Sequence, residues 1–127
     1  MSEEVIILGW KTLDEIKEVY AKSHLFIMPS KAEGMSVAII EAMASGLYVL
    51  TSNEANKYKL VKNKTNGFII KNTSAQSIAN EILTYYNDFF LIKTEIPAEE
   101  IQELIVDYNW DSIGERYFEE LVRIVKD

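Results

Sequence analysis

The sequence contains no cysteine, which excludes disulfide bonds and thiolate metal sites. It has one histidine and no His/Asp cluster, so no metal ion is expected. Basic residues are also in the minority, because 13 Lys and Arg stand against 20 Asp and Glu, for a formal net charge of −7. This balance argues against a nucleic acid or an anionic membrane as the partner, since either one calls for a basic surface.

Long hydrophobic runs are missing as well. No apolar stretch reaches the ~18 residues of a membrane span, and residues 1–10 lack the basic start and cleavage site of a signal peptide. We therefore expect a cytoplasmic protein. The hydrophobic content of 48% is ample for a core, and 127 residues suit one domain or part of one.

Short apolar runs alternate along the chain with segments of helical periodicity. The runs at 5–8, 25–28, 48–52 and 68–70 predict four buried strands, and residues 13–20, 36–45, 54–61, 73–90, about 97–106 and about 111–126 predict helices. Strands without polar alternation are typical of a parallel sheet covered on both faces. The fold class is therefore α/β, a truncated, doubly wound, Rossmann-like parallel sheet of about four strands. A glycine-rich G-x-G-x-x-G turn is absent, which excludes a self-contained dinucleotide-binding unit.

The segment that carries chemistry spans residues 29–46, where a strand ends, a loop with a glycine follows and a helix begins. Open α/β sheets bind their ligands at such places. The backbone N–H groups of Gly34, Met35, Ser36 and Val37, together with the positive end of the helix, predict an anion site suited to a phosphate.

Two glutamates flank this helix start. Glu33 lies in the loop and Glu41 in the second turn of the helix, so they do not share one helix face, although both could point into the crevice. A carboxylate accepts two hydrogen bonds from vicinal hydroxyls, the arrangement with which proteins hold ribose and hexose diols. Taken alone, the pair could equally be two solvated glutamates.

In this context the segment resembles the donor-binding E-x7-E motif of glycosyltransferase family 4, a retaining group with two Rossmann-like domains in the GT-B arrangement. The likeness extends along almost the entire chain in the right order. The matching segments are Leu8-Gly9-Trp10, Phe26-Ile27-Met28-Pro29-Ser30, Gly46-Leu47-Tyr48-Val49-Leu50, Asn66-Gly67-Phe68 and Asn109-Trp110.

The resemblance implies a hexosyltransferase-type enzyme whose substrate is a nucleotide-diphosphate sugar, with no cofactor and no metal. By the resemblance, Glu33 is the catalytic-site residue that binds hydroxyls of the transferred sugar, and Glu41 binds the ribose. The backbone amides of Gly34, Met35 and Ser36 would meet the diphosphate and the sugar.

Three departures from the family pattern qualify the resemblance. Tyr48 stands where the family usually has a proline, Glu54-Ala55-Asn56 replaces a Val-Gly-Gly-like turn, and Lys59 replaces a glutamate. The region that would carry the family's diphosphate-binding arginine and lysine lies upstream of Met1, as does the acceptor-binding domain. We therefore expect the 127 residues to lack turnover alone, to need an acceptor-binding N-terminal domain or partner chain, and to form a homodimer through an uncovered strand.

Two other readings remain open. The chain could be a non-catalytic nucleotide-sugar-binding module or subunit that needs a partner chain, or an interaction domain that kept the fold and lost the ligand. Lys31 could face a phosphate from its loop or could simply be an exposed lysine.

Overall fold

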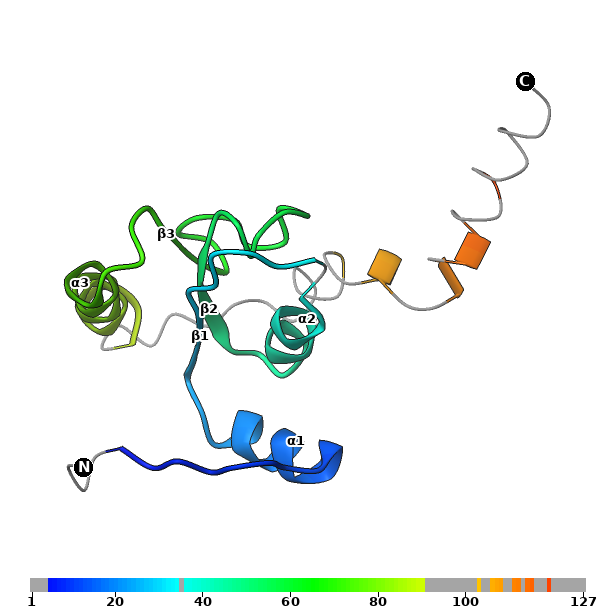
Figure 1. Ribbon diagram of the computed structural model, residues 1–127, viewed down its shortest axis with the longest axis horizontal. Coiled ribbons are helices and arrows are strands. Elements are labelled where there is room, and N and C mark those ends of the chain that lie inside the picture. The colour runs from blue at the N-terminus through cyan, green and yellow to red at the C-terminus, as the bar shows by residue number, and fades with distance from the viewer. Residues whose placement is uncertain are drawn as a thin grey trace.

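The computed structural model describes residues 5–34 and 36–90, together with residues 103, 106–108, 111, 112, 114, 115 and 119. Within these residues the chain forms three strands and three α-helices (Figure 1). In chain order the elements are α1 (Leu13–Ala21), β1 (Leu25–Met28), α2 (Val37–Ala44), β2 (Tyr48–Ser52), β3 (Gly67–Ile70), α3 (Ala75–Tyr85), the π-helix η1 (Tyr86–Phe90) and the 3-10 helix η2 (Val106–Tyr108).

The three strands form one parallel sheet in the order β1-β2-β3. Leu25 lies opposite Tyr48 in the first pair, and Leu50 lies opposite Phe68 in the second. The predicted α/β class and three of the predicted strands are thereby confirmed. Because all strands run the same way, their carboxyl ends share one edge of the sheet.

The prediction of a fourth strand at residues 5–8 is wrong for this structure. These residues form no strand, and the side chains of Ile6 and Ile7 are 78% and 73% exposed. The physical reason is the lack of a neighbour: an apolar run becomes a buried strand only where another strand pairs with its backbone. Within the described residues β1 pairs only with β2, so its outer edge is open too.

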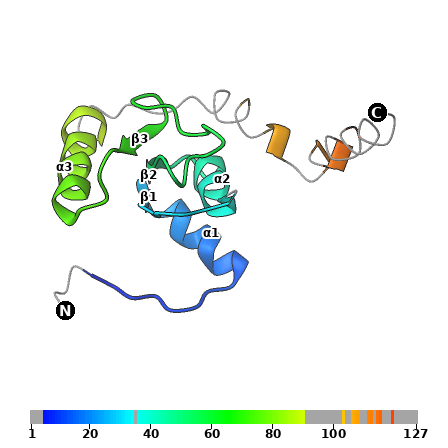
Figure 2. The same ribbon diagram turned by 45° about the horizontal axis from the view of Figure 1, so that its top comes forward.

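Helices cover both faces of the sheet, with α2 on one side and α3 on the other (Figures 1 and 2). On the α2 side, Ile39 and Met43 pack in a buried cluster with Val49 of β2. On the α3 side, Leu50 and Phe68 pack with Tyr85. The central strand β2 is buried along its whole length, which explains why its sequence shows no polar alternation before Thr51.

The ends of α1 and α2 follow their local sequence signals. The Thr12 hydroxyl accepts from the backbone N–H of Glu15 at 3.4 Å, and the Glu15 carboxylate accepts from the Thr12 N–H at 2.8 Å, which completes the predicted capping box. The hydrogen bonds from Thr12 hold the pKa of Glu15 below its ordinary value. At the end of α2, Gly46 adopts a φ of 80° and donates to the Met43 carbonyl at 2.9 Å, so it ends the helix as predicted.

The connection from β2 to β3 differs from the predicted short helix at 54–61, because turns occupy these residues. Asparagine side chains replace the helical hydrogen bonds. Asn56 bonds to both the N–H and the C=O of Val61 at 2.9 Å, and the fully buried Asn66 bonds to the N–H of Lys62 and the carbonyl of Leu60. These asparagines satisfy backbone groups at the buried part of the loop, Leu60 and Val61, where a helix would use its own backbone hydrogen bonds.

Two further predictions concern helices. The N-cap of α3 is Ser74, whose hydroxyl accepts from the Ser77 N–H at 3.2 Å, rather than Thr73 as the predicted capping box required. Most of the predicted helices at about 97–106 and 111–126 lie outside the described residues. Among the residues that are described, no helix combines the length and the hydrophobicity that crossing a membrane requires.

Candidate functional site

The loop of residues 29–36 leaves the carboxyl end of β1 and enters α2. In a parallel sheet the loops beyond the carboxyl ends of the strands form the usual ligand crevice. The loop therefore occupies the position that the sequence assigned to the functional site, and its internal contacts decide what it can bind.

Two buried hydroxyls at the end of β2 anchor this loop. Thr51 donates to the carbonyl of Met28 at 3.0 Å, and Ser52 donates to the carbonyl of Ser30. The Ser52 hydroxyl also accepts from the backbone N–H of Ala55 at 3.2 Å, so a single fully buried oxygen joins the loops that follow β1 and β2. The loop is thereby held against the sheet by side chains that sit outside the predicted site.

Glu33 is positioned within this loop by its neighbour Ser30. The Ser30 hydroxyl donates to Oε1 of Glu33 at 3.0 Å, and the glutamate side chain is half-buried. One carboxylate oxygen is thus oriented by the protein, while a carboxylate has acceptor capacity for further hydrogen bonds. This is an arrangement that could receive hydroxyl groups of a ligand.

The N-cap residue of α2, Ser36, makes no capping hydrogen bond through its side chain. Ser36 is only 7% exposed, and its hydroxyl donates to the sulfur of Met28 at 3.0 Å instead of accepting from an amide of the first turn. The first N–H groups of the helix therefore remain for a ligand. Gly34 is exposed and Val37 is 52% exposed, which leaves the approach open, and Met35 lies outside the described residues.

Glu41 lies one turn further along α2 and faces α1. Its side chain lines a hollow of 280 Å³ between the two helices. The lining residues are Leu13, Ile16, Lys17, Tyr20, Glu41, Ala44 and Ser45. Burial raises the pKa of the Tyr20 hydroxyl, and the negative charge of Glu41 raises it further.

The structure does not bring the two glutamates into one hollow. Glu33 points back to Ser30 at the carboxyl edge of the sheet, whereas Glu41 borders the groove between α1 and α2, which Glu33 does not line. Both stand beside the same helix start, so a ligand extended along α2 could contact each in turn.

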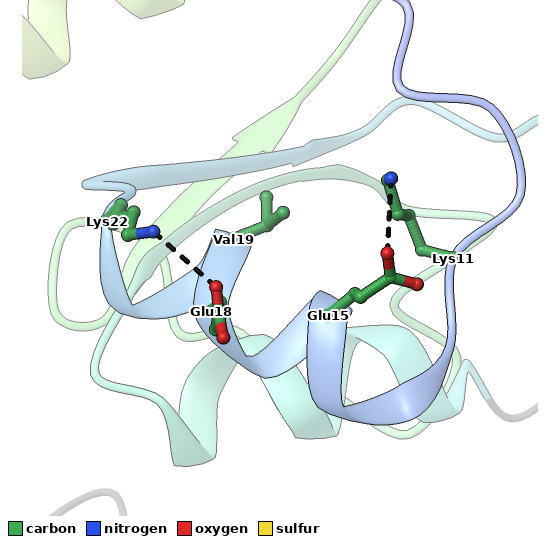
Figure 3. A pocket seen from close by; sticks show the side chains of 5 residues that line it. All are labelled: Lys11, Glu15, Glu18, Val19 and Lys22. Carbon is green, nitrogen blue, oxygen red and sulfur yellow. Dashed lines mark hydrogen bonds and ion pairs between the residues drawn. The ribbon is translucent and has the colours of Figure 1, made fainter.

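A further hollow, of 180 Å³, lies on the surface of α1 (Figure 3). Two ion pairs border it, Lys11 to Glu15 at 3.4 Å and Lys22 to Glu18 at 3.6 Å. Both pairs are exposed and four residues apart on one helix, and such pairs contribute little. Within the described part of the chain, no group of three or more His, Cys, Asp or Glu is placed to hold a metal ion.

Comparison with known proteins decides the family. The family model described as "Glycosyl transferases group 1" matches residues 1–105, which include the whole sheet and the loop with Glu33. The chain belongs to this family. The loop that carries Glu33 therefore lies within the part of the chain that matches this family.

Curated relatives and a solved structure agree with this assignment. The chain is 33% identical over 88 residues to the UDP-Gal:alpha-D-GlcNAc-diphosphoundecaprenol alpha-1,3-galactosyltransferase of Escherichia coli, covering 69% of this chain and 22% of that protein. It is 25% identical to the phosphatidylinositol N-acetylglucosaminyltransferase gpi3 subunit of Schizosaccharomyces pombe, covering 91% of this chain and 25% of that protein.

The sucrose-phosphate synthase of Thermosynechococcus elongatus has a similar fold, with a TM-score of 0.65 and 24% identity over 85% of this chain and 27% of that one. The chain thus spans about a quarter of the length of the relatives that it matches.

Sequence reasoning missed the residues that position the loop. The sequence predicts Thr51 and Ser52 only as the end of a strand and Ser30 only as part of the 29–46 segment, although their hydroxyls hold the segment that carries Glu33. The sequence does contain a signal for Thr51 and Ser52, because these two polar residues follow the buried apolar run at 48–50. Buried hydroxyls need partners, and loop carbonyls beside the strand end are the nearest ones.

Proposed function

We propose that this chain is the donor-binding part of a retaining glycosyltransferase, which moves a hexosyl group from a nucleotide-diphosphate sugar to an acceptor hydroxyl. The observation that carries the proposal is the uncapped start of α2, reached by a loop in which Ser30 orients Glu33. Membership in the group 1 family supports a transferase, and the finer assignment rests on the chemistry of this loop.

The diphosphate of the donor would bind at the start of α2. The backbone N–H groups of Gly34, Met35, Ser36 and Val37 are the donors, and the helix dipole favours the negative charge. The hydrogen bond from Ser36 to Met28 supports this role, since a capping hydroxyl would compete with the phosphate for the same amides.

The transferred sugar would lie against Glu33. Its carboxylate accepts hydrogen bonds from sugar hydroxyls and places the anomeric carbon beside the diphosphate. The chemistry is stabilisation of the leaving diphosphate and positioning of the two reactants, without a protein nucleophile. In these roles Glu33 acts on the sugar and the amides act on the leaving group.

The ribose would reach Glu41 from the groove between α1 and α2. Four residues separate Val37 from Glu41, and at 1.5 Å per residue this is about 6 Å along the helix. That rise is comparable to the reach of a diphosphate, so one nucleotide sugar could meet the helix start and Glu41 together. An acceptor-binding domain or a partner chain would complete the catalytic unit.

Calorimetric titration with uridine, guanosine and adenosine diphosphate sugars tests the proposal. One of the three should bind, and Glu33→Ala should weaken the nucleotide sugar while sparing the free nucleoside diphosphate. Equal weakening of both ligands would mean that the sugar does not lie at Glu33. Binding without turnover would favour the non-catalytic module that needs a partner chain, and no binding would favour an interaction domain.

A further inference from the structure

A third hollow, at the carboxyl edge of the sheet, differs from the donor loop in its chemistry. It measures 460 Å³, and residues that follow each of the three strands line it. They are Lys31 after β1, Glu54 after β2, and Lys71, Asn72 and Thr73 after β3, with Ile70 at the end of β3 itself. Because residues from three consecutive loops line it, the hollow follows from the arrangement of the strands in the sheet.

The charges in this hollow favour an anion. The ion pairs within the described residues join side chains on or beside α1, and none of them includes Lys31, Lys71 or Glu54. Lys71 also lies in residues 55–80, a stretch with five lysines and no Asp or Glu in a chain of net charge −7. The lining itself has two lysines and one glutamate, so the hollow carries a local excess of positive charge in a chain whose net charge is negative.

Asn72 adds an oriented hydrogen-bond donor. Its Oδ1 accepts from the backbone N–H of Ser74 at 2.9 Å, which fixes which way the amide is turned. Its side-chain nitrogen makes no hydrogen bond within the described residues and remains a donor for a ligand. With the Thr73 hydroxyl and two ammonium groups as donors and Glu54 as an acceptor, the hollow matches a group that has both phosphate oxygens and hydroxyls.

The hollow is separate from the proposed donor contacts. Neither Glu33 nor Glu41 lines it, and Ile70 packs in the cluster on the α3 side of the sheet, whereas the donor loop leads into α2 on the other side. Lys31, two residues before Glu33, is the point at which the two regions adjoin.

We propose that this hollow binds the phosphate group of a hydroxyl-bearing phosphate ester, at a subsite that includes Lys31 of the 29–36 loop but neither Glu33 nor Glu41. Lys31 and Lys71 pair with the phosphate oxygens, the Asn72 amide donates to them, and Glu54 accepts a hydrogen bond from a hydroxyl of the ester. The subsite depends on the described hollow alone and stands whether or not the donor role of Glu33 is correct.

Calorimetric titrations of the 127-residue chain at low ionic strength test this subsite, with glucose 6-phosphate, inorganic phosphate and glucose as probes. Both phosphates should bind and glucose should not. Lys71→Gln should weaken both phosphates by about tenfold or more, because a charge-assisted hydrogen bond is lost. Glu54→Gln should weaken glucose 6-phosphate and spare inorganic phosphate. The matched control is Lys22→Gln, which removes an exposed lysine paired with Glu18 at the end of α1 and should change neither.

Three outcomes would overturn the subsite: no binding of either phosphate, equal weakening by Lys71→Gln and Lys22→Gln, or a Lys71→Gln variant that loses uridine diphosphate as strongly as glucose 6-phosphate. The last outcome would assign the hollow to the donor site. Binding of phosphate by a chain that binds no nucleoside diphosphate would instead reject the donor proposal and leave the subsite intact. Thermal unfolding by circular dichroism checks that each variant is folded.

Discussion

The hydroxyl of Ser52, at the end of β2, donates a hydrogen bond to the carbonyl oxygen of Ser30, 22 residues earlier in the chain. Ser30 in turn orients Glu33, so a side chain with no exposed surface supports the loop that carries the proposed sugar contact. The proposed ligand contact, Glu33, is thus distinct from Ser30 and Ser52, which hold its loop in place. Substitutions of the two kinds should have different effects on stability and on ligand affinity.

Ser52→Ala should lower both stability and donor affinity. The substitution leaves the Ser30 carbonyl and the Ala55 N–H without their partner, which costs about 1–3 kcal/mol when such groups stay buried. Urea unfolding measures the first effect and donor titration the second. Ser23→Ala is the control, since its hydroxyl bonds to the carbonyl of Val19 at the end of α1, away from the donor loop and from the groove beside Glu41. Equal effects of the two substitutions would show that the Ser52 linkage has no special role.

Glu41→Ala should weaken the nucleotide sugar and the free nucleoside diphosphate together, because both contain the ribose diol. Loss of a charge-assisted bidentate contact costs on the order of 2–3 kcal/mol. The control is Glu81→Ala, which removes another half-buried glutamate, on α3. Unchanged affinity for both ligands in a folded Glu41→Ala variant would reject the ribose assignment.

Gly67→Ala should destabilise the fold because β2 and β3 approach closely at this glycine. An added Cβ would overlap the carbonyl oxygen of Val49 and approach Cγ1 of Val61 at 2.7 Å. Relieving this overlap requires a backbone shift, so we expect the free energy of unfolding, measured in urea, to fall by about 1–3 kcal/mol. Gly34→Ala is the contrast: nothing lies within 4 Å of its added Cβ, so stability should hold while donor binding falls. A Gly67→Ala variant with unchanged stability would mean that β2 and β3 can move apart at this point without a loss of unfolding free energy.

The isolated chain should self-associate and show no transferase turnover. Residues 5–8 present extended apolar side chains, and the outer edge of β1 has no strand partner within the described residues. Such edges pair with other chains. Sedimentation at several concentrations should reveal a dimer that Ile6→Lys shifts toward monomer and that Leu83→Lys, at an exposed site on α3, does not. A strict monomer with measurable sugar transfer would contradict both expectations.

The sequence predicted those features that depend on neighbouring residues. Thr12 and Glu15 form their capping box and Gly46 ends α2 because each signal acts within one turn of helix. The place of the loop that carries Glu33 also follows from local order, since a strand, a loop and a helix come in sequence. Whether Glu33 and Glu41 bind a ligand stays a prediction.

Features that depend on residues distant in the chain could not be predicted from the sequence. Residues 5–8 have the composition of a strand, yet a strand exists only when another one pairs with it. The separate positions of Glu33 and Glu41 depend on where α1 packs, which helical spacing does not specify. Likewise, only the folded sheet brings Lys31 and Lys71 to one hollow, because 40 positions of sequence separate them.

The central strand β2 also determines how the described core can come apart. It contributes Val49 to the cluster beneath α2 and Tyr48 and Leu50 to the cluster beneath α3. Neither helix can therefore detach without uncovering part of the same strand, and the two sides cannot open as independent units. In native-state hydrogen exchange the amides of β2 should be the last to exchange, and they should do so at a rate that reports global unfolding, whichever helix leaves first.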